Sequence, residues 1–466
     1  MRDLGFAAIV VMMLPMAVMS TFVGVLLWVW VAMLSPSDAL TGFMTGVPLN
    51  KIVFGVVVLS MLAPRQKKSL YLDPAGIALL LFCVSATISS QTSISSPDLT
   101  WEIFQKLMKE SALALCIMWV MTTRLRIQAL VFTVVVALSF IGAKEGLIGV
   151  LTAGGHKITG IGSVGDNNAL ATALLMMLPF ALYVSRHLEL RPARLAVLAV
   201  AGLSLVTILL TKSRGGFGGL VILAVLLILR SDKKAIGLIG VAAVGGAILL
   251  LAPSEIFSRL DTVSNLEADG SAVGRFVAWK ISLLIALANP LFGGGGHAVQ
   301  FVPVWNHFVP LIGSVNFIST PMVPTYALAA HSIYFEILGD NGFVGFGLYL
   351  SVIGATLLNC LSIRRMARPY PELRWARELA QATAMSIILY LTTGALLSMG
   401  YFELFYITVG MVSACRMVVK REVAAIMAAA PSPAGLAPVA RPAVPAWQPD
   451  PLSRPLRPTR EIVRRV

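Results

Sequence analysis

The sequence has little charge: only 12% of its 466 residues are Asp, Glu, Lys or Arg, whereas 57% are hydrophobic. This balance excludes a soluble globular domain of this length. The apolar runs approach or exceed ~18 residues, the length that marks a helix able to cross a membrane. They do not alternate apolar with polar residues, which excludes a transmembrane β-barrel. The predicted fold class is therefore all-α, a polytopic bundle of transmembrane helices.

Cysteine is also scarce. The four cysteines, Cys83, Cys116, Cys360 and Cys415, lie far apart in apolar segments, so neither a disulfide framework nor a cysteine metal site is expected. No Asp-Asp or Asp-x-Asp pair stands on a predicted outer loop, which gives little support to a divalent-metal site. No metal and no cofactor are predicted. The net charge of +14 does not indicate nucleic acid as a partner, because the cations lie in short loops between apolar runs.

What the sequence does have is an alternation of loops rich and poor in Lys and Arg. Loops at 65–68, 124–126 and 364–377 are basic, whereas 35–46 and 91–100 are poor in cations. Because basic loops stay in the cytoplasm, this pattern predicts about twelve spans with both termini inside. The spans are expected near residues 5–34, 47–63, 72–90, 103–122, 126–150, 167–185, 194–211, 214–230, 235–252, 331–360, 376–398 and 401–420. The first contains Pro15 and is either one long kinked helix or two short ones; two would put the N-terminus outside.

Two regions break the short-loop pattern. Residues 253–330 form a large outer loop, predicted to be periplasmic, in which 275–288 has the pattern of an amphipathic helix that could lie in the membrane interface. Residues 422–466 are rich in Pro, Ala and Arg and predict a disordered cytoplasmic tail. The sequence therefore predicts a membrane domain over residues 1–421 followed by this tail.

Three residues on the predicted outer side carry the functional hypothesis: Arg214, Arg275 and His331. Topology disfavours cations there, and arginine binds phosphate bidentately while staying charged. A histidine can take a proton from a hydroxyl near neutral pH. Other interpretations remain open: a tight helix–helix turn with snorkelling cations for Arg214, lipid headgroup contact for Arg275, and a simple helix cap for His331.

Further polar residues on the same side are candidates for substrate binding. Lys212 shares a short turn with Arg214 and could join an anion site at the start of the next helix. Asp166 or Asn167 is most simply a helix N-cap, but either could bind sugar hydroxyls. Lys144 either lines a polar cavity or lies at the outer interface, and its neighbour Glu145 is not expected to face it, because adjacent residues on a helix diverge.

The glycine run of residues 293–296, which follows Asn289-Pro290-Leu291-Phe292, is interpreted as a hinge or turn.

Taken together, these motifs resemble the O-antigen ligase and polymerase superfamily, membrane glycosyltransferases with a GT-C fold. The pieces that carry the resemblance are Gly165-Asp166-Asn167-Asn168-Ala169-Leu170-Ala171, Ser213-Arg214-Gly215, Gly274-Arg275 with Trp279, Asn289-Pro290-Leu291-Phe292-Gly293, and His331-Ser332 with Gly342 and Gly345. Each piece is short, and their order around one large outer loop makes the set specific. The stretch 22–30 is similar to O-glycosylation ligases encoded with exosortase systems.

The resemblance implies a polyprenyl-diphosphate-linked saccharide donor, a periplasmic active site in a bacterial inner membrane, and no metal. It implies that Arg214 and Arg275 hold the diphosphate and that His331 activates the acceptor, which is a hydroxyl of a lipid, a protein or a glycan. A double displacement would need a carboxylate nucleophile, and no outer carboxylate stands out. Three alternatives remain open: a polymerase of the same superfamily, a flippase or transporter of lipid-linked oligosaccharides, and a non-catalytic membrane scaffold.

Overall fold

A computed structural model describes residues 2–34, 42–62, 71–156, 158, 160, 164–230, 246 and 270–429. The chain divides into two compact units, residues 1–422 and residues 423–466. Most of the predicted tail, from residue 430 on, lies outside the described residues. The predicted span 235–252, apart from residue 246, and the loop residues 253–269 lie outside them as well.

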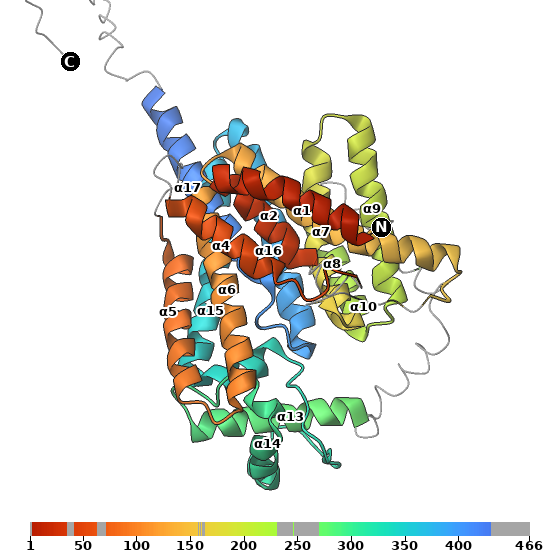
Figure 1. Ribbon diagram of the computed structural model, residues 1–466, viewed down its shortest axis with the longest axis vertical. Coiled ribbons are helices and arrows are strands. Elements are labelled where there is room, and N and C mark those ends of the chain that lie inside the picture. Colours follow the sequence, from red (N-terminus) through yellow and green to blue (C-terminus); the bar gives the residue numbers. More distant parts are fainter. Residues whose placement is uncertain are drawn as a thin grey trace, which may run out of the picture. The chain divides into compact units, whose positions relative to one another are not determined.

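All regular structure in the described ranges is helical (Figure 1). The α-helices are α1 (Arg2–Met19), α2 (Thr21–Leu34), α4 (Leu49–Leu62), α5 (Pro74–Gln91), α6 (Pro97–Val120), α7 (Arg124–Leu151), α8 (Asn167–His187), α9 (Arg191–Leu210), α10 (Arg214–Arg230), α13 (Gly270–Ala288), α14 (Val302–Phe308), α15 (Ile333–Ala367), α16 (Arg374–Thr393) and α17 (Glu403–Ala429). Short 3₁₀ helices are η3 (Ala298–Gln300), η4 (Val309–Ser314), η5 (Pro371–Leu373) and η6 (Gly394–Leu396).

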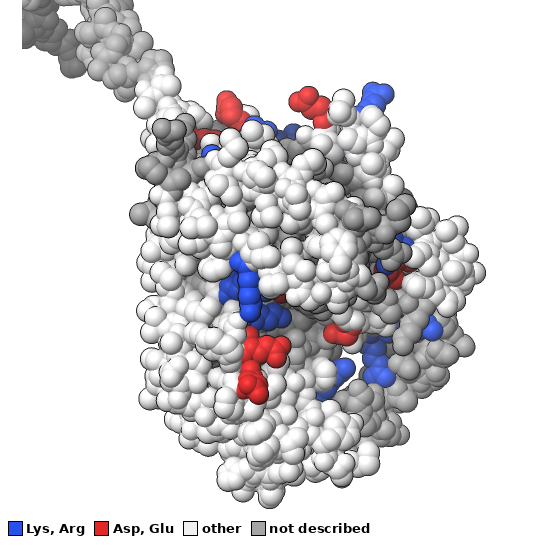
Figure 2. All heavy atoms as spheres, viewed as in Figure 1, with Lys and Arg blue, Asp and Glu red and all other residues white. Residues whose placement is uncertain are grey.

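The predicted all-α membrane fold is confirmed, whereas the predicted number of spans is not. Among the described residues, six helical segments are long and apolar enough to cross a membrane, and they correspond to α5, α7, α8, α9, α15 and α16. Helices α4 and α10 occupy predicted spans but have only 14 and 17 residues. Helix α6 carries Lys106, Lys109 and Glu110 inside its predicted span, and acidic and basic side chains gather over it in Figure 2.

The first predicted span forms two helices rather than one. Helix α1 ends at Met19 and helix α2 begins at Thr21, so only Ser20 lies between them. The ring of Phe6 stacks on that of Trp30 with centroids 4.8 Å apart, although the two residues are 24 positions apart in the sequence. A single continuous helix would separate them by about 36 Å. The chain therefore folds back on itself at Ser20, which confirms the alternative of two short helices.

Helix α8 is deeply enclosed in the bundle. Its residues 169–181 are all buried, and it packs against α7, α9, α10 and α16. Helix α8 is apolar around most of its circumference, as expected of a helix surrounded by other helices. Its first turn is therefore fixed in place by its neighbours on several sides, and this turn carries Asp166 and Asn167.

Helix α13 lies across the ends of α5 and α15 at one end of the bundle (Figure 1). It begins at Gly270, so Arg275 lies in its second turn and does not open it as predicted. Its apolar face packs on protein: Val277, Ile281 and Ile285 belong to one buried cluster with Trp305 and Phe308 of α14. The apolar face is therefore covered by α14 and the 3₁₀ helices, which is not the placement in the membrane interface that the amphipathic pattern allowed.

The glycine run after α13 crosses a kink in α15. Gly342 has φ 66° and ψ −170° inside α15, which interrupts that helix. A Cβ on Gly293 (φ 71°) would lie 2.4 Å from the backbone nitrogen of Gly342, so only glycine fits there. The amide of Gly294 donates to the carbonyl of Gly339 at 2.8 Å. The prediction of a turn at 293–296 is confirmed, and the turn ties α13 to the start of α15.

Candidate functional site

His331 lies just before α15. The peptide group between Ala330 and His331 is fixed by two hydrogen bonds, one to its carbonyl oxygen and one from its N–H. The indole Nε1–H of Trp279, on α13, donates to the carbonyl oxygen of Ala330 at 2.7 Å. The backbone N–H of His331 donates to Oγ of Ser398 at 2.9 Å. His331 has φ 47°, a left-handed conformation that is rare for residues with a side chain and is often found at functional sites. We call this arrangement the His331 clamp.

Burial and a nearby positive charge both favour the neutral form of the His331 imidazole. Burial is the largest effect and lowers the pKa of His331, and the positive charge of Arg275 lowers it further. The carboxylates of Asp166 and Glu336 act in the opposite direction but do not outweigh these two effects. A neutral imidazole can accept a proton, so this histidine is suited to act as a general base near neutral pH.

The same electrostatic effects show which predicted residues the fold brings together. Arg275 from α13 and Asp166 before α8 both lie close enough to His331, before α15, for their charges to act on its imidazole. They are 56 or more positions apart in the sequence. The structure therefore assembles a basic, an acidic and an imidazole side chain at one end of the helices.

Asp166 caps helix α8. Its carboxylate accepts hydrogen bonds from the backbone N–H groups of Asn168 at 2.7 Å and of Ala169 at 3.0 Å. This confirms the N-cap interpretation. Asn167 reaches the next segment, because its Nδ2 donates to the carbonyl oxygen of Thr211 at 3.4 Å. The first turn of α8 is thus joined to the turn that carries Lys212 and Arg214.

The turn between α9 and α10 presents its two cations outward. Lys212 and Arg214 are exposed, whereas Thr211 and Ser213 beside them are buried. Lys212 has φ 54°, also in the left-handed region. Oγ of Ser213 accepts the N–H of Gly216 at 3.0 Å, so one of the helix N–H groups predicted to meet a phosphate already has a partner. Recognition of an anion at this turn would therefore depend mainly on the two cationic side chains.

A carboxylate that the sequence did not single out lies beside His331. Glu336 is only 4% exposed, and its Oε2 accepts the N–H of Gly400 at 2.7 Å. Its Oε1 lies 3.7 Å from Nε2 of His297. Both oxygens are thus engaged, which makes Glu336 a poor nucleophile although it stands near the site. Glu336 occupies the first turn of α15.

His297 is the second residue that sequence reasoning missed. Burial lowers the pKa of His297, but the ion-pair contact with Glu336 and the negative charge of Asp340 outweigh burial and raise the pKa above its usual value. The signal available in the sequence was the spacing of Glu336 and Asp340, which places two carboxylates on one face of an otherwise apolar span. His297 itself could not be paired with them, since 39 residues separate it from Glu336.

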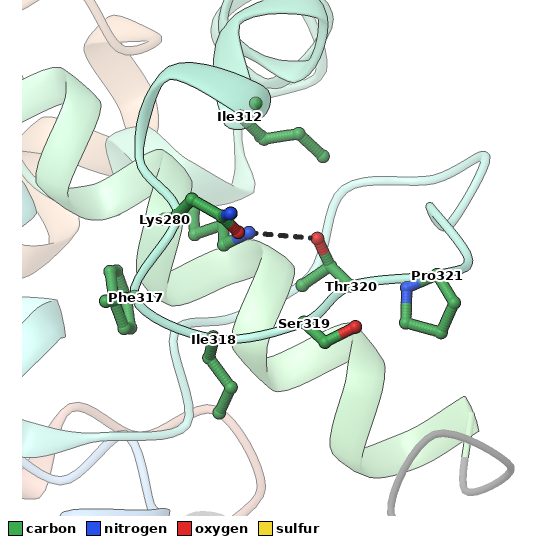
Figure 3. Close-up of a pocket in the computed structure, with 9 residues that line it drawn as sticks. Lys280, Ile312, Phe317, Ile318, Ser319, Thr320 and Pro321 are labelled. Atoms are coloured by element: carbon green, nitrogen blue, oxygen red, sulfur yellow. Dashed lines mark hydrogen bonds between the residues drawn. The ribbon is translucent and has the colours of Figure 1, made fainter.

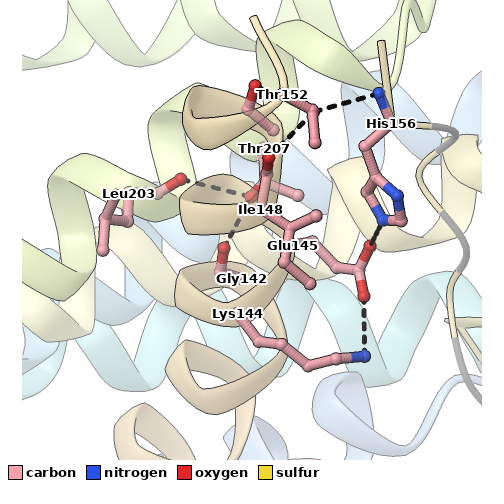
Figure 4. Close-up of polar contacts among 9 residues, drawn as sticks. Gly142, Lys144, Glu145, Ile148, Thr152, His156, Leu203 and Thr207 are labelled. Atoms are coloured by element: carbon pink, nitrogen blue, oxygen red, sulfur yellow. Dashed lines mark hydrogen bonds and ion pairs between the residues drawn. The ribbon is translucent and has the colours of Figure 1, made fainter. Parts of the chain in front are cut away.

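Lys144 belongs to a different polar group (Figure 4). Its Nζ lies 2.8 Å from Oε1 of Glu145, and Oε2 of Glu145 lies 2.8 Å from Nε2 of His156. The expectation that Lys144 and Glu145 do not face each other was wrong, because their long side chains bend toward one another from adjacent positions. The ion pair of Lys144 thus belongs to this group on α7 and the turn after it, and the group shares no residue with the His331 clamp.

The described ranges hold no group of three or more His, Cys, Asp or Glu side chains that could bind a metal ion.

Comparison with known families identifies two regions of the chain. Residues 1–189 match a family of unknown function, DUF5935. Residues 199–350 match the O-Antigen ligase family. The chain therefore carries a region similar to the O-antigen ligase family over residues 199–350. No curated protein matches it.

The O-antigen ligase domain contains the three residues of the functional hypothesis, because Arg214, Arg275 and His331 all fall within residues 199–350. The site also extends beyond this domain. Asp166 comes from the region that matches the family of unknown function, and Ser398 of the His331 clamp follows the domain by 48 residues. The O-antigen ligase domain alone therefore lacks one of the two hydrogen bonds that hold His331.

Proposed function

We propose that this protein is a metal-independent membrane glycosyltransferase of the O-antigen ligase type. It moves a saccharide from a polyprenyl-diphosphate donor to a hydroxyl of a lipid, protein or glycan acceptor. The reaction takes place on the periplasmic side of a bacterial inner membrane, at the end of a GT-C-like bundle that carries His331. The observation that carries the proposal is the clamped His331, whose pKa is lowered by burial and by the charge of Arg275.

In this reaction the acceptor oxygen attacks the anomeric carbon of the donor sugar while the bond from that carbon to the diphosphate oxygen breaks. His331 takes the proton of the attacking hydroxyl. Arg214 and Arg275 bind the diphosphate and stabilise the charge that develops on it as it leaves, a task that guanidinium groups can perform without a metal. A single displacement of this kind inverts the anomeric centre.

The remaining predicted residues have supporting roles in the proposal. Lys212 adds a second positive charge next to Arg214 and would also bind the diphosphate. Asn167 and Asp166 would contact sugar hydroxyls in addition to their contacts within the protein. Lys144, which the structure places in a separate group with Glu145 and His156, would contact the glycan only if the saccharide extends along α7.

A transfer assay with purified protein in detergent tests the proposal. Lipid-linked glycan donor and a panel of lipid, peptide and glycan acceptors are supplied on the same side, and product is followed by mass spectrometry. We expect Arg275→Ala to lower transfer by ~10²-fold or more and Arg275→Lys to retain only part of the activity, because lysine keeps the charge without the bidentate geometry. Wild-type protein that transfers to no acceptor but moves lipid-linked glycan across vesicles would establish a transporter instead.

The identity of the acceptor in the same assay separates ligase from polymerase. Transfer to a second lipid-linked glycan favours a polymerase, and transfer to a lipid or protein hydroxyl favours a ligase. A protein acceptor would also agree with the predicted relation to ligases that accompany exosortase systems.

A further inference from the structure

A cavity of about 650 Å³ lies on the side of α13 near η4 (Figure 3). Its wall combines one residue of α13 with residues of η4 and of the loop that follows η4. The lining residues are Lys280, Ile312, Gly313, Asn316, Phe317, Ile318, Ser319, Thr320 and Pro321. We call it the Lys280 pocket. Its volume falls within the range of about 300–1,000 Å³ that is usual for small-molecule sites.

Lys280 is an unusual residue to find in this position. It is only 2% exposed, although it is a charged residue within the segment 275–288 that the sequence predicted as an amphipathic helix. Its Nζ donates to Oγ1 of Thr320 at 3.1 Å, and no carboxylate among the described residues is paired with it. A buried cation normally has an anionic partner, because desolvation of an unpaired charge is costly.

The rest of the wall adds groups that suit a sugar. The side chains of Asn316, Ser319 and Thr320 supply hydroxyl and amide groups, which can donate hydrogen bonds to sugar hydroxyls and accept them. The apolar surfaces of Phe317 and Ile318 stand beside them. One cation, several neutral polar groups and an apolar wall match a saccharide that carries one negative charge.

The Lys280 pocket shares helix α13 with the proposed active site but faces a different direction. Lys280 follows Arg275 by five positions, which corresponds to about 7.5 Å along the helix axis and a rotation of about 140°. Trp279, the residue before Lys280, reaches the His331 clamp through Ala330. The two sites are thus distinct and close enough for a short saccharide chain to occupy both.

We propose that the Lys280 pocket is a glycan subsite that binds a sugar unit bearing an anionic substituent, either the carboxylate of a uronic acid or a phosphate ester. The anion pairs with Nζ of Lys280, and the hydroxyls of that sugar bond to Asn316, Ser319 and Thr320. This proposal rests on the proposed glycosyl transfer and adds to it the charge class of the saccharide.

Binding measurements on the full-length protein in detergent test the subsite without requiring transfer. The probes are a tetragalacturonate, its carboxyl-reduced neutral counterpart, and a tetrasaccharide of the same length with one phosphate ester, each titrated by calorimetry. We expect the probe with the preferred anion to bind about 10-fold or more tightly than the neutral counterpart, and Lys280→Met to abolish that preference, since hydrogen bonds to charged groups contribute most at such sites. Lys280→Arg keeps the charge and should retain the preference.

Matched controls make the outcome decisive. Lys420→Met removes the same charge from an exposed position outside the pocket and should leave binding unchanged. Thr320→Ala keeps the charge of Lys280 but removes a hydroxyl proposed to bond the sugar, so it should weaken the binding of charged and neutral probes alike. This result can be read even if Lys280→Met fails to fold. His331→Ala should bind the preferred probe normally, and sustained transfer by this variant would overturn the active-site proposal alone.

Three results would overturn the subsite. One is equal binding of the charged and neutral probes, and another is an unaltered preference in folded Lys280→Met. The third is displacement of the probe by phosphatidylglycerol in mixed micelles at concentrations where phosphatidylcholine has no effect, because that result would assign the pocket to a lipid headgroup.

Discussion

The His331 clamp makes a specific prediction for Trp279→Phe. Phenylalanine keeps an aromatic ring next to Phe335, with which Trp279 stacks at 5.1 Å. It loses the indole N–H that holds the carbonyl oxygen of Ala330, a residue only 1% exposed. A buried carbonyl left without a donor costs about 1–3 kcal/mol.

If the clamp holds His331 in its catalytic position, this free energy adds to the activation barrier of transfer. The Ala330 carbonyl and the His331 N–H belong to the same peptide group, so releasing one side lets the plane turn and the imidazole move. Because each 1.36 kcal/mol of barrier corresponds to a factor of ten in rate, we expect kcat to fall by about 5- to 150-fold. KM for the donor should change little, since the indole is not proposed to touch the diphosphate.

The assay is steady-state transfer by purified protein, combined with thermal unfolding in the same detergent. Ser398→Ala releases the other side of the peptide, and the double variant should lose less than the product of the two single effects, because both bonds restrain one group. Trp101→Phe, at an exposed position on α6, is the matched control and should retain wild-type kcat. A folded Trp279→Phe variant with unchanged kcat would refute the positioning role and leave the bond a purely structural one.

Three further predictions follow from the site and the fold. Arg275→Met removes a positive charge that lowers the pKa of His331, so the acidic limb of residual transfer should move to higher pH. Gly293→Ala introduces a side chain at φ 71° and against the backbone of α15, so thermal unfolding should show a loss of at least about 1–2 kcal/mol. Cysteines introduced at exposed Tyr326 and Leu125 should react oppositely with an impermeant thiol reagent on intact cells, because the proposed topology puts only Tyr326 outside.

Each of these three has a control that decides it. An acidic limb that stays in place in Arg275→Met would mean that its charge does not act on the base. Gly313→Ala, where an added Cβ meets no atom within 4 Å, should be tolerated. An equal loss of stability in both variants would contradict the close contact between the backbones at Gly293 and Gly342. Labelling at position 125 but not at 326 would move the proposed site to the cytoplasmic side.

The sequence by itself determined the membrane class and the location of most helices. Apolar runs and the distribution of cations are local properties. The positions of α5, α7, α8 and α9 could therefore be predicted to within about three residues, whereas the C-terminal ends of α15 and α16 differ from the prediction by seven and five residues. Helix caps such as Asp166 could be predicted for the same reason, because a cap involves only the next three residues. Cations are unusual on a predicted outer loop, so Arg214, Arg275 and His331 could be identified as candidates from the sequence.

Only the tertiary structure decided which of these residues meet. The approach of Arg275 and Asp166 to His331, the ion pair of His297 with Glu336, and the bond from Trp279 to Ala330 all join segments far apart in the chain. The burial of Lys280 is of the same kind, since it depends on how η4 and the loop after it fold over α13. A hydropathy pattern shows which face of a helix is apolar, but it does not show which other segment packs against that face. The charged residues of this protein meet only through that packing, so their pairs could not be predicted from the pattern.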